Sequence, residues 1–488
     1  MMLEQEIKIP SSPAASYRIN IAAGILGSLW PQIEADFAGY NKFVVTDENL
    51  VSAGHLQKLL GQNEVPTFII SPAGETSKNI DTAISIIEAM EKAVYEIRKW
   101  PFKKSVQIFH HNDSDGLSSG AILSLAFERE GFEVSRFCLE KPYPVVLKKI
   151  FEQENQLLVF ADFAGRIAPL LSELNRGRNL TIILDHHKAQ HSSDPKVLNL
   201  DPELYGLKGD RDITASTTCY LFARVLNAAN HDMAHIAAIG AVGDKFFVNG
   251  KLVSVNRDIV IEAVNQGFAE IIENKTGEQY ILKSSKGDIR LDKLGDYLDI
   301  LGAVGYYQKG PDMGVEVCLQ GITNESDHMV ESLKGIKQMA FDREIERFKK
   351  EGLKVSPHIQ WFNLKDRFSN MGVKMVGLLC EEISNGGLID TKKYIAGFQI
   401  IPNKIPGMGA IEVNQTKISM RVSDYMEKEI RAGRATGLDN FLPEATSRLG
   451  GFSDACHSLT AATTVSIGEE ENLIREMELV LSSHKNEI

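Results

Sequence analysis

Residues 180–187 read LTIILDHH, an apolar and β-branched run followed directly by an aspartate and two histidines. Such a run is typical of a buried strand that ends at polar side chains. Further strand candidates lie at 106–109, 133–138 and 157–160, and helical patterns lie near 117–130, 144–153 and 166–175. Strands that alternate with helices in this way predict a parallel sheet with right-handed crossovers.

Acidic and imidazole side chains gather in four clusters, each of which we expect to follow an apolar strand. The clusters are His111-Asn112-Asp113-Ser114-Asp115-Gly116, Asp162, Asp185-His186-His187 and Asp244. A lone aspartate at a strand end often caps the next helix, so the prediction depends on the four clusters occurring together. In parallel sheets, ligands bind beyond the carboxyl ends of the strands, which is where we expect the clusters to meet.

Converging carboxylates of this kind need cations. Two unit charges 4 Å apart cost about 4 kcal/mol at an effective dielectric of 20. Aspartate and histidine ligands without thiolates suit Mn²⁺ and also Mg²⁺. If residues 111–115 continue the strand, His111, Asp113 and Asp115 point the same way and His110 packs on the opposite face. Gly116 would then permit a sharp turn into a helix.

The four clusters resemble the motifs of the DHH phosphoesterase family, namely HxDxDG, a lone strand-end aspartate, DHH and GD. The resemblance spans roughly residues 104–250. The family includes RecJ-like exonucleases, oligoribonuclease-like enzymes and cyclic dinucleotide phosphodiesterases. Further on, 419–421 and 450–457 resemble the Ser-x-Arg strand and the glycine-glycine motif of the DHHA1 domain. Phe452 stands where relatives commonly carry histidine, and His457 is the candidate to compensate.

The resemblance implies an α/β fold with three parts. These are a small αβ N-terminal module at 1–98, a parallel-sheet DHH domain with a helical connector at 99–350, and a smaller mixed α/β DHHA1-like substrate-binding domain at 351–488. Two metal ions about 3.5–4 Å apart can activate a bridging water and neutralise a phosphate.

The resemblance also implies roles for single residues. The ligands would be His111 and Asp113 for one metal ion, Asp115, His186 and Asp244 for the second, and Asp162 as the bridge. His187 would face the substrate phosphate, and Asp185 would orient His186. The substrate-binding residues would be Arg421, Gly450, Gly451 and His457. Arg431, Arg434 and Arg448 add basic charge to the same region.

Residues 17–90 resemble a different family. VVTDEN at 44–49 and PAGETSK at 72–78 are similar to the nucleotide-binding half of 3-dehydroquinate synthases and related polyol dehydrogenases. This resemblance would place Asp47, Asn49, Glu75 and Lys78 at NAD. The glycine-rich turn that holds the pyrophosphate is missing, as is the catalytic half. We therefore expect neither NAD binding nor synthase activity, but a sensory or structural module.

The composition restricts the choice of substrate and location. The net charge is −12, and no aromatic and basic stacking module is evident, which favours short substrates over long strands. The five cysteines form no CxxC pair, no apolar run of 18 residues occurs, and no secretory signal is recognisable at the N-terminus. We expect a cytoplasmic protein that acts away from membranes.

Three functions stay open at this point. The first is a metal-dependent phosphoesterase of the nuclease type, either a RecJ-like single-strand exonuclease or an enzyme that degrades short oligonucleotides. The second is a phosphodiesterase or phosphatase for a small molecule, such as a cyclic dinucleotide or a pyrophosphate-like compound. The third is a catalytically dead binding or regulatory protein, against which the complete ligand set argues.

Overall fold

The computed structural model describes residues 3–8, 16–21, 26–36, 44–61, 63, 67–70, 80–284 and 287–484 of the 488-residue chain. The chain divides into two compact units, at 1–81 and 82–488. The predicted domain boundaries near 98 and 350 stay predictions. No helix among the described residues has the length and apolar character needed to cross a membrane.

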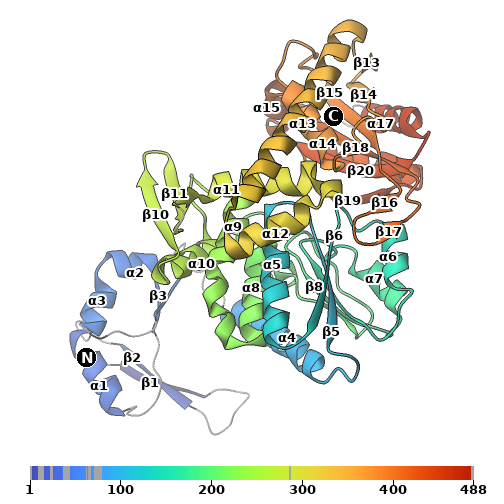
Figure 1. Ribbon diagram of the computed structural model, residues 1–488. Coiled ribbons are helices and arrows are strands. Elements are labelled where there is room, and N and C mark those ends of the chain that lie inside the picture. The colour runs from blue at the N-terminus through green and yellow to red at the C-terminus, as the bar shows by residue number, and fades with distance from the viewer. Residues whose placement is uncertain are drawn as a thin grey trace. The chain divides into compact units, whose positions relative to one another are not determined.

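The N-terminal unit contains two small sheets and short helices (Figure 1). Its strands are β1 (Leu3–Lys8), β2 (Ser16–Ile21), β3 (Val44–Asp47) and β4 (Thr67–Ile70), and its helices are α1 (Leu26–Asp36), α2 (Glu48–Ser52) and α3 (His55–Leu60). β1 and β2 pair antiparallel, whereas β3 and β4 pair parallel.

The residues on which the synthase resemblance depends are only partly described. Asp47 ends β3 and Asn49 lies in α2, whereas Glu75 and Lys78 lie outside the described residues. The resemblance of this unit to 3-dehydroquinate synthases therefore stays a prediction.

A five-stranded parallel sheet forms the centre of the second unit, in the order β6-β5-β7-β8-β9. Its strands are β5 (Ser105–His110), β6 (Glu133–Cys138), β7 (Leu157–Ala161), β8 (Leu180–Leu184) and β9 (Val197–Asn199). The surrounding helices are α4 (Ile80–Arg98), α5 (Ser114–Arg129), α6 (Pro144–Ile150), α7 (Ala168–Asn175), α8 (Ala215–Leu226) and α9 (Ala234–Gly243). The predicted parallel sheet is confirmed. β9 was not predicted, because three residues are too few for a recognisable pattern.

Both faces of this sheet are covered, which explains why β7 and β8 are apolar at every position. All five residues of each strand are buried. Val159 and Ile182 belong to the core beneath α4, α5, α8 and α9, while Phe160 and Ile183 face the core beneath α6 and α7. Strands buried on both faces read as continuous apolar runs.

A mainly helical segment follows. It contains η2 (Pro202–Tyr205) and η3 (Ala228–Met233) beside the sheet, then α10 (Ser254–Asn265), α11 (Leu291–Asp299), the π-helical turn η4 (Ile300–Val304), η5 (Tyr306–Gln308), α12 (Gly310–Gln320) and the long α13 (Asn324–Glu351). Thr323 and Ser326 form a capping box that starts α13. The segment also holds a three-stranded antiparallel sheet of β10 (Ala269–Asn274), β11 (Gly277–Leu282) and β12 (Ile289–Arg290).

The C-terminal part is a six-stranded mixed sheet in the order β13-β14-β15-β18-β20-β19. Its strands are β13 (Lys354–Val355), β14 (Ile359–Asn363), β15 (Tyr394–Ile400), β18 (Gln415–Arg421), β19 (Phe452–Cys456) and β20 (Thr460–Ser466), with β16 (Lys404–Ile405) and β17 (Gly409–Ala410) as a separate pair. The helices are α14 (Lys374–Ile383), α15 (Asp424–Arg431), α16 (Leu438–Arg448) and α17 (Glu470–His484). The predicted mixed α/β fold is confirmed.

We call residues 82–351 the first lobe and residues 354–484 the second lobe. Figure 1 shows α13 running from the helical segment to the second sheet. Helix α14 connects the lobes by packing, because Met375, Val376 and Leu379 belong to the same apolar core as the first sheet.

Tight packing between α5, α8 and α9 should be sensitive to a single methyl group at Gly240. A side-chain carbon at this position would lie 2.3 Å from the Ser216 hydroxyl oxygen and 2.4 Å from Asp115 Oδ1. We expect Gly240→Ala to lower the free energy of unfolding by about 1–3 kcal/mol, measured by urea denaturation. Gly335→Ala is the control, since nothing lies within 4 Å of its added carbon. Equal stability of the two variants would contradict this packing.

Candidate metal centre

The HNDSDG segment leaves the sheet and enters a helix sooner than predicted. β5 ends at His110, and α5 begins at Ser114. Asp113 is the N-cap of this helix and accepts a hydrogen bond from the Gly116 backbone N–H at 3.1 Å. The expected extended alternation over 111–115 is therefore wrong. Helical geometry instead turns the side chain of Asp115, in the first turn, into the protein.

Gly116 and His110 fill structural positions beside the cluster. Gly116 lies within α5, and an added side-chain carbon would come within 2.5 Å of the His111 carbonyl oxygen. Close approach of two backbones, and not a sharp turn, thus explains the glycine. His110 is 1% exposed and packs against Gly120. Burial lowers its pKa to about 3, which agrees with a packing role.

Asp162 follows β7 in an unusual backbone conformation. Its φ is 65°, a left-handed value that non-glycine residues rarely adopt. Its backbone N–H donates to the Leu184 carbonyl at 3.0 Å, which ties it to the end of the neighbouring strand. Strain of this kind persists where the surrounding structure fixes it and is frequent at functional sites.

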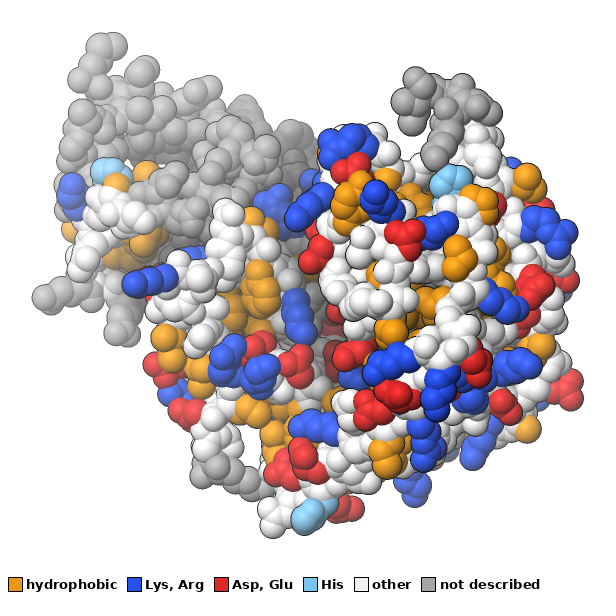
Figure 2. All heavy atoms as spheres, turned by 90° about the horizontal axis from the view of Figure 1, so that it is seen from above, with side chains coloured by type: hydrophobic (Ala, Val, Ile, Leu, Met, Phe, Trp, Pro, Cys, Tyr) orange, Lys and Arg blue, Asp and Glu red, His pale blue; other side chains and the backbone are white. Residues whose placement is uncertain are grey.

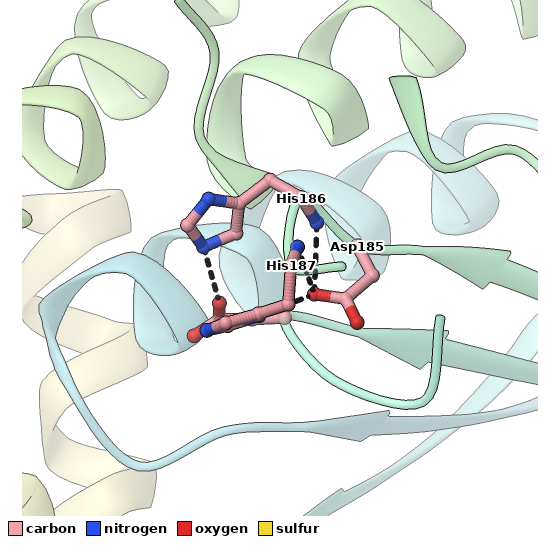
Figure 3. A group of neighbouring side chains, drawn as sticks. Asp185, His186 and His187 are labelled. Atoms are coloured by element: carbon pink, nitrogen blue, oxygen red, sulfur yellow. Dashed lines mark hydrogen bonds and ion pairs between the residues drawn. The ribbon is translucent and has the colours of Figure 1, made fainter. Parts of the chain in front are cut away.

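The Asp185-His186-His187 segment is held by a set of short hydrogen bonds (Figure 3). Asp185 Oδ1 accepts from the His186 backbone N–H and from His187 Nδ1, both at 2.8 Å. Asp185 Oδ2 accepts from the Gly165 backbone N–H, also at 2.8 Å. Asp185 therefore orients the ring of His187, in contrast to the prediction that it orients the ring of His186.

The His186 ring is instead oriented by Gly209, which the sequence did not single out. His186 Nδ1 donates to the Gly209 carbonyl at 2.6 Å, so its Nε2 is directed at the carboxylates. A side-chain carbon at Gly209 would come within 1.3 Å of the His186 carbonyl oxygen. The loop can approach His186 only because residue 209 is glycine.

Asp244 comes from a helix and not from a strand. It is the C-cap residue of α9, so the prediction that all four clusters follow strands is wrong for this one. The preceding residues are almost all buried, and a helix that is apolar on all sides cannot be distinguished from a buried strand by its periodicity.

The six predicted ligands nevertheless meet at one place. His111 Nδ1 lies 2.8 Å from Asp113 Oδ2 and 3.4 Å from Asp162 Oδ2. On the other side, His186 Nε2 lies 3.3 Å from Asp162 Oδ1, and 3.5 Å and 3.8 Å from Oδ2 of Asp244 and Asp115. The atoms fall into the groups His111-Asp113-Asp162 and Asp115-His186-Asp244, each within 4.8 Å. Asp162 thus directs one oxygen at each histidine.

The charges of this cluster are poorly balanced without cations. Burial, together with the carboxylate of Asp162, raises the pKa of Asp115 to about 6. Burial and Asp115 raise the pKa of Asp244 well above its usual range. Burial opposes the charge on His111, but Asp113 and Asp162 outweigh it and raise its pKa to about 10. Protons are therefore retained where divalent cations would bind, and the oxygen and nitrogen donors suit such cations.

Comparison with known proteins identifies the fold. No protein-family model matches the chain. A solved structure described as the DHH domain of a member of the S1p family of ribosomal proteins has a TM-score of 0.53 and 16% identity, and the match covers 84% of this chain and 93% of that one. The chain has the DHH fold. RecJ of Thermus thermophilus in complex with Mn²⁺ also has a TM-score of 0.53, with 14% identity, covering 82% of this chain and 55% of RecJ.

One relative matches this chain in sequence over part of its length. An uncharacterized protein of Methanocaldococcus jannaschii is 31% identical over 177 residues, which is 35% of this chain. The match spans about two fifths of that relative, or 39% of its length.

Basic residues from both lobes of this DHH-fold protein lie close to one another. Lys417 and Arg421 lie on one face of β18, and Lys141 lines the cavity that contains the ligand cluster. Lys417 is 7% exposed. Burial, with repulsion from Lys141 and Arg421, lowers its pKa to about 7. The Arg421 guanidinium lies beside α14, since a side-chain carbon at Gly377 would meet it at 2.8 Å.

The remaining residues predicted for substrate binding are two glycines and a histidine. Gly450 has a φ of 66°, and a side-chain carbon at Gly451 would come within 2.3 Å of the Thr464 carbonyl oxygen, so both are needed for the turn into β19. Burial lowers the pKa of His457, and His187 contributes to this shift, which places the two imidazoles near each other. Arg431, Arg434 and Arg448 form ion pairs with surface glutamates.

The contact between His186 and Gly209 predicts an effect on metal affinity. Gly209→Ala should displace the loop and leave His186 Nδ1 without its acceptor, and lost orientation of a ligand typically costs about 10- to 100-fold in affinity. Calorimetric titration with Mn²⁺ measures the change, with Gly335→Ala as the control. Wild-type affinity in Gly209→Ala would show that the carbonyl does not orient the ligand.

Proposed function

We propose that this protein is a metal-dependent phosphoesterase that hydrolyses phosphodiester bonds with a water activated by two divalent ions. The observation that carries the proposal is the position of Asp162, whose two carboxylate oxygens face His111 and His186. His111 and Asp113 would hold one ion, and Asp115, His186 and Asp244 would hold the other, with Asp162 shared. Two such ions supply a nucleophilic hydroxide and neutralise phosphate charge.

His187 is proposed to contact the substrate phosphate. Its side chain is 37% exposed and lines the cavity, in contrast to the buried His186. Burial opposes the charge on Asp185, but His187 and His186 outweigh it and hold the pKa of this carboxyl well below its usual range. His187 Nδ1 donates to Asp185, so its Nε2 is left for the cavity, where it would contact a phosphate oxygen.

Mn²⁺ is proposed as the preferred ion, with Mg²⁺ as the alternative. The ligands are two imidazoles and four carboxylates, a mixture that fits Mn²⁺ better than the all-oxygen surroundings typical of Mg²⁺. The solved RecJ structure of the same fold was determined in complex with Mn²⁺.

The substrate is proposed to be a single-stranded end or a short oligonucleotide, as in a RecJ-like exonuclease or an oligonucleotide-degrading enzyme. Lys141, Lys417 and Arg421 form a cationic group beside the ligand cluster, and it could hold a second phosphate of the substrate. On the face seen in Figure 2, lysines and arginines are interspersed with aspartates and glutamates. Such a surface favours short substrates.

A small-molecule phosphodiester, such as a cyclic dinucleotide, is the second candidate. The cationic group favours it as much as it favours a strand end, because a compact substrate with two phosphates needs only one further anion site. Turnover of a substrate panel distinguishes the two.

The panel contains long single-stranded DNA, RNA of two to five nucleotides, a cyclic dinucleotide and pyrophosphate, each with Mn²⁺. We expect Mn²⁺-dependent release of mononucleotides from the short RNA. Asp162→Ala should abolish turnover, because it removes the ligand shared by both ions, whereas Asp342→Ala on the surface of α13 should have no effect. Retained activity in Asp162→Ala would refute the two-metal assignment, and no turnover of any substrate would favour a binding protein.

Binding of anions by Lys141, Lys417 and Arg421 should depend on pH. Burial lowers the pKa of Lys417 to about 7 and raises that of the neighbouring Glu140 to about 7, so Lys417 loses its positive charge and Glu140 gains a negative charge as the pH rises above 7. Sulfate stays a dianion over this range, and its log Kd should rise by about one per pH unit for each proton that binding takes up. Calorimetry from about pH 6 to 9 measures this slope. Lys417→Met should flatten it, and an unchanged slope in that variant would contradict the assignment.

A further inference from the structure

A lysine of the second lobe reaches the candidate ligands of the first. Lys374 is the first residue of α14, and its Nζ lies 3.5 Å from Asp113 Oδ2. The two residues are 261 positions apart, so only the packing of the lobes creates the contact. Lys374 belongs to no motif that the sequence revealed.

The backbone around Lys374 is fixed against the first lobe. The buried carboxylate of Glu140 accepts hydrogen bonds from the backbone N–H groups of Val373 and Lys374. The Gly372 N–H donates to the Ala303 carbonyl at 2.8 Å. A side-chain carbon at Gly372 would come within 2.4 Å of Glu140 Oε1, so the helix start fits closely. Lys374 is therefore presented to the site by a rigid helix terminus.

Three carboxylates act electrostatically on the ammonium group. They are Asp113, Asp244 and Asp299. Asp299 is not one of the candidate ligands, and it accepts a hydrogen bond from the Ser114 backbone N–H at 3.0 Å. A lysine ammonium group is cationic at neutral pH, and this one lies 3.5 Å from Asp113 Oδ2. Asp299 remains as a counter-ion when a metal ion takes Asp113.

The same ammonium group is partly exposed. The Lys374 side chain is 33% exposed, and it is close enough to Lys417 to contribute to the lowered pKa of that residue. Lys374 therefore contacts a candidate ligand and also neighbours the cationic group of Lys141, Lys417 and Arg421. An ammonium group offers three donors to phosphate oxygens and can turn from one acceptor to another on its flexible stem.

We propose that Lys374 binds a non-bridging oxygen of the phosphate under attack and that it releases Asp113 to the metal ion when the site is loaded. The inference rests on the phosphoesterase function proposed above. One ammonium group would then weaken metal binding and strengthen substrate binding. Lys374 competes with the cation for Asp113, and it attracts the substrate phosphate.

Lys374→Met tests both effects, because it keeps the length of the side chain and removes its charge. Without substrate, calorimetry should give a Mn²⁺ Kd about 3- to 10-fold lower than that of the wild type, since a competing cation is removed. With saturating Mn²⁺, kcat/KM for a short RNA should fall by about 100-fold, as for the loss of a donor to the reacting group. Lys374→Arg keeps the charge and should restore the wild-type Mn²⁺ affinity.

Lys349→Met is the matched control. Lys349 pairs with Glu346 at 2.6 Å on the surface of α13, and its removal should change neither Mn²⁺ affinity nor turnover. Circular dichroism checks the fold, and Lys374→Gln is a second uncharged variant should Lys374→Met unfold.

The results of these experiments distinguish failure of the Lys374 proposal from failure of the proposed phosphoesterase function. Weaker Mn²⁺ binding together with lower turnover would indicate a structural role for Lys374 and would overturn the proposal. Wild-type turnover in Lys374→Met would overturn it as well, while the phosphoesterase function would stand. A wild-type protein that hydrolyses no phosphodiester overturns the phosphoesterase function itself and, with it, the phosphate contact.

Discussion

The carboxylate of Asp162 is the constraint on which the candidate site depends. One of its oxygens lies 3.4 Å from His111 and the other 3.3 Å from His186, so a single side chain links two groups of donors. Its left-handed backbone and its hydrogen bond to the end of β8 fix this carboxylate at the sheet edge. Four carboxylates this close together, two of them buried and two partly buried, repel one another strongly, and the fold tolerates them in a form that divalent cations can stabilise.

The two histidines and the four carboxylates depend on packing that lies outside the motifs. Parallel strands bring His111, Asp162 and His186 to one edge, because β5, β7 and β8 are neighbours in the sheet. Asp115 is held by the backbone N–H groups of Ala215 and Ser216 at the start of α8, at 2.8 and 3.0 Å. The close fit of α5, α8 and α9 then brings the end of α9 to the same place. Lys141 of the first lobe lines the cavity with positive charge, and it lies close to Lys417 of the second lobe.

Much of this arrangement could be predicted from the sequence, because apolar runs followed by polar residues locate the strand ends of a parallel sheet. The six candidate ligands were found in this way and through the resemblance to a known family. Asp244 was assigned to a strand, since a helix buried on all sides has no distinctive periodicity. The sequence does not indicate roles for Gly209 and Lys374, because each acts through a contact with a residue that lies far away along the chain. The short strand β9 and the sheet of β10–β12 lacked a clear alternating pattern.

Anomalous scattering from crystals soaked in Mn²⁺ tests the central claim most directly. The account predicts two peaks about 3.5–4 Å apart, one beside His111 and Asp113 and one beside His186 and Asp244, with Asp162 contacting both. A single peak, or peaks that do not share Asp162, would contradict it.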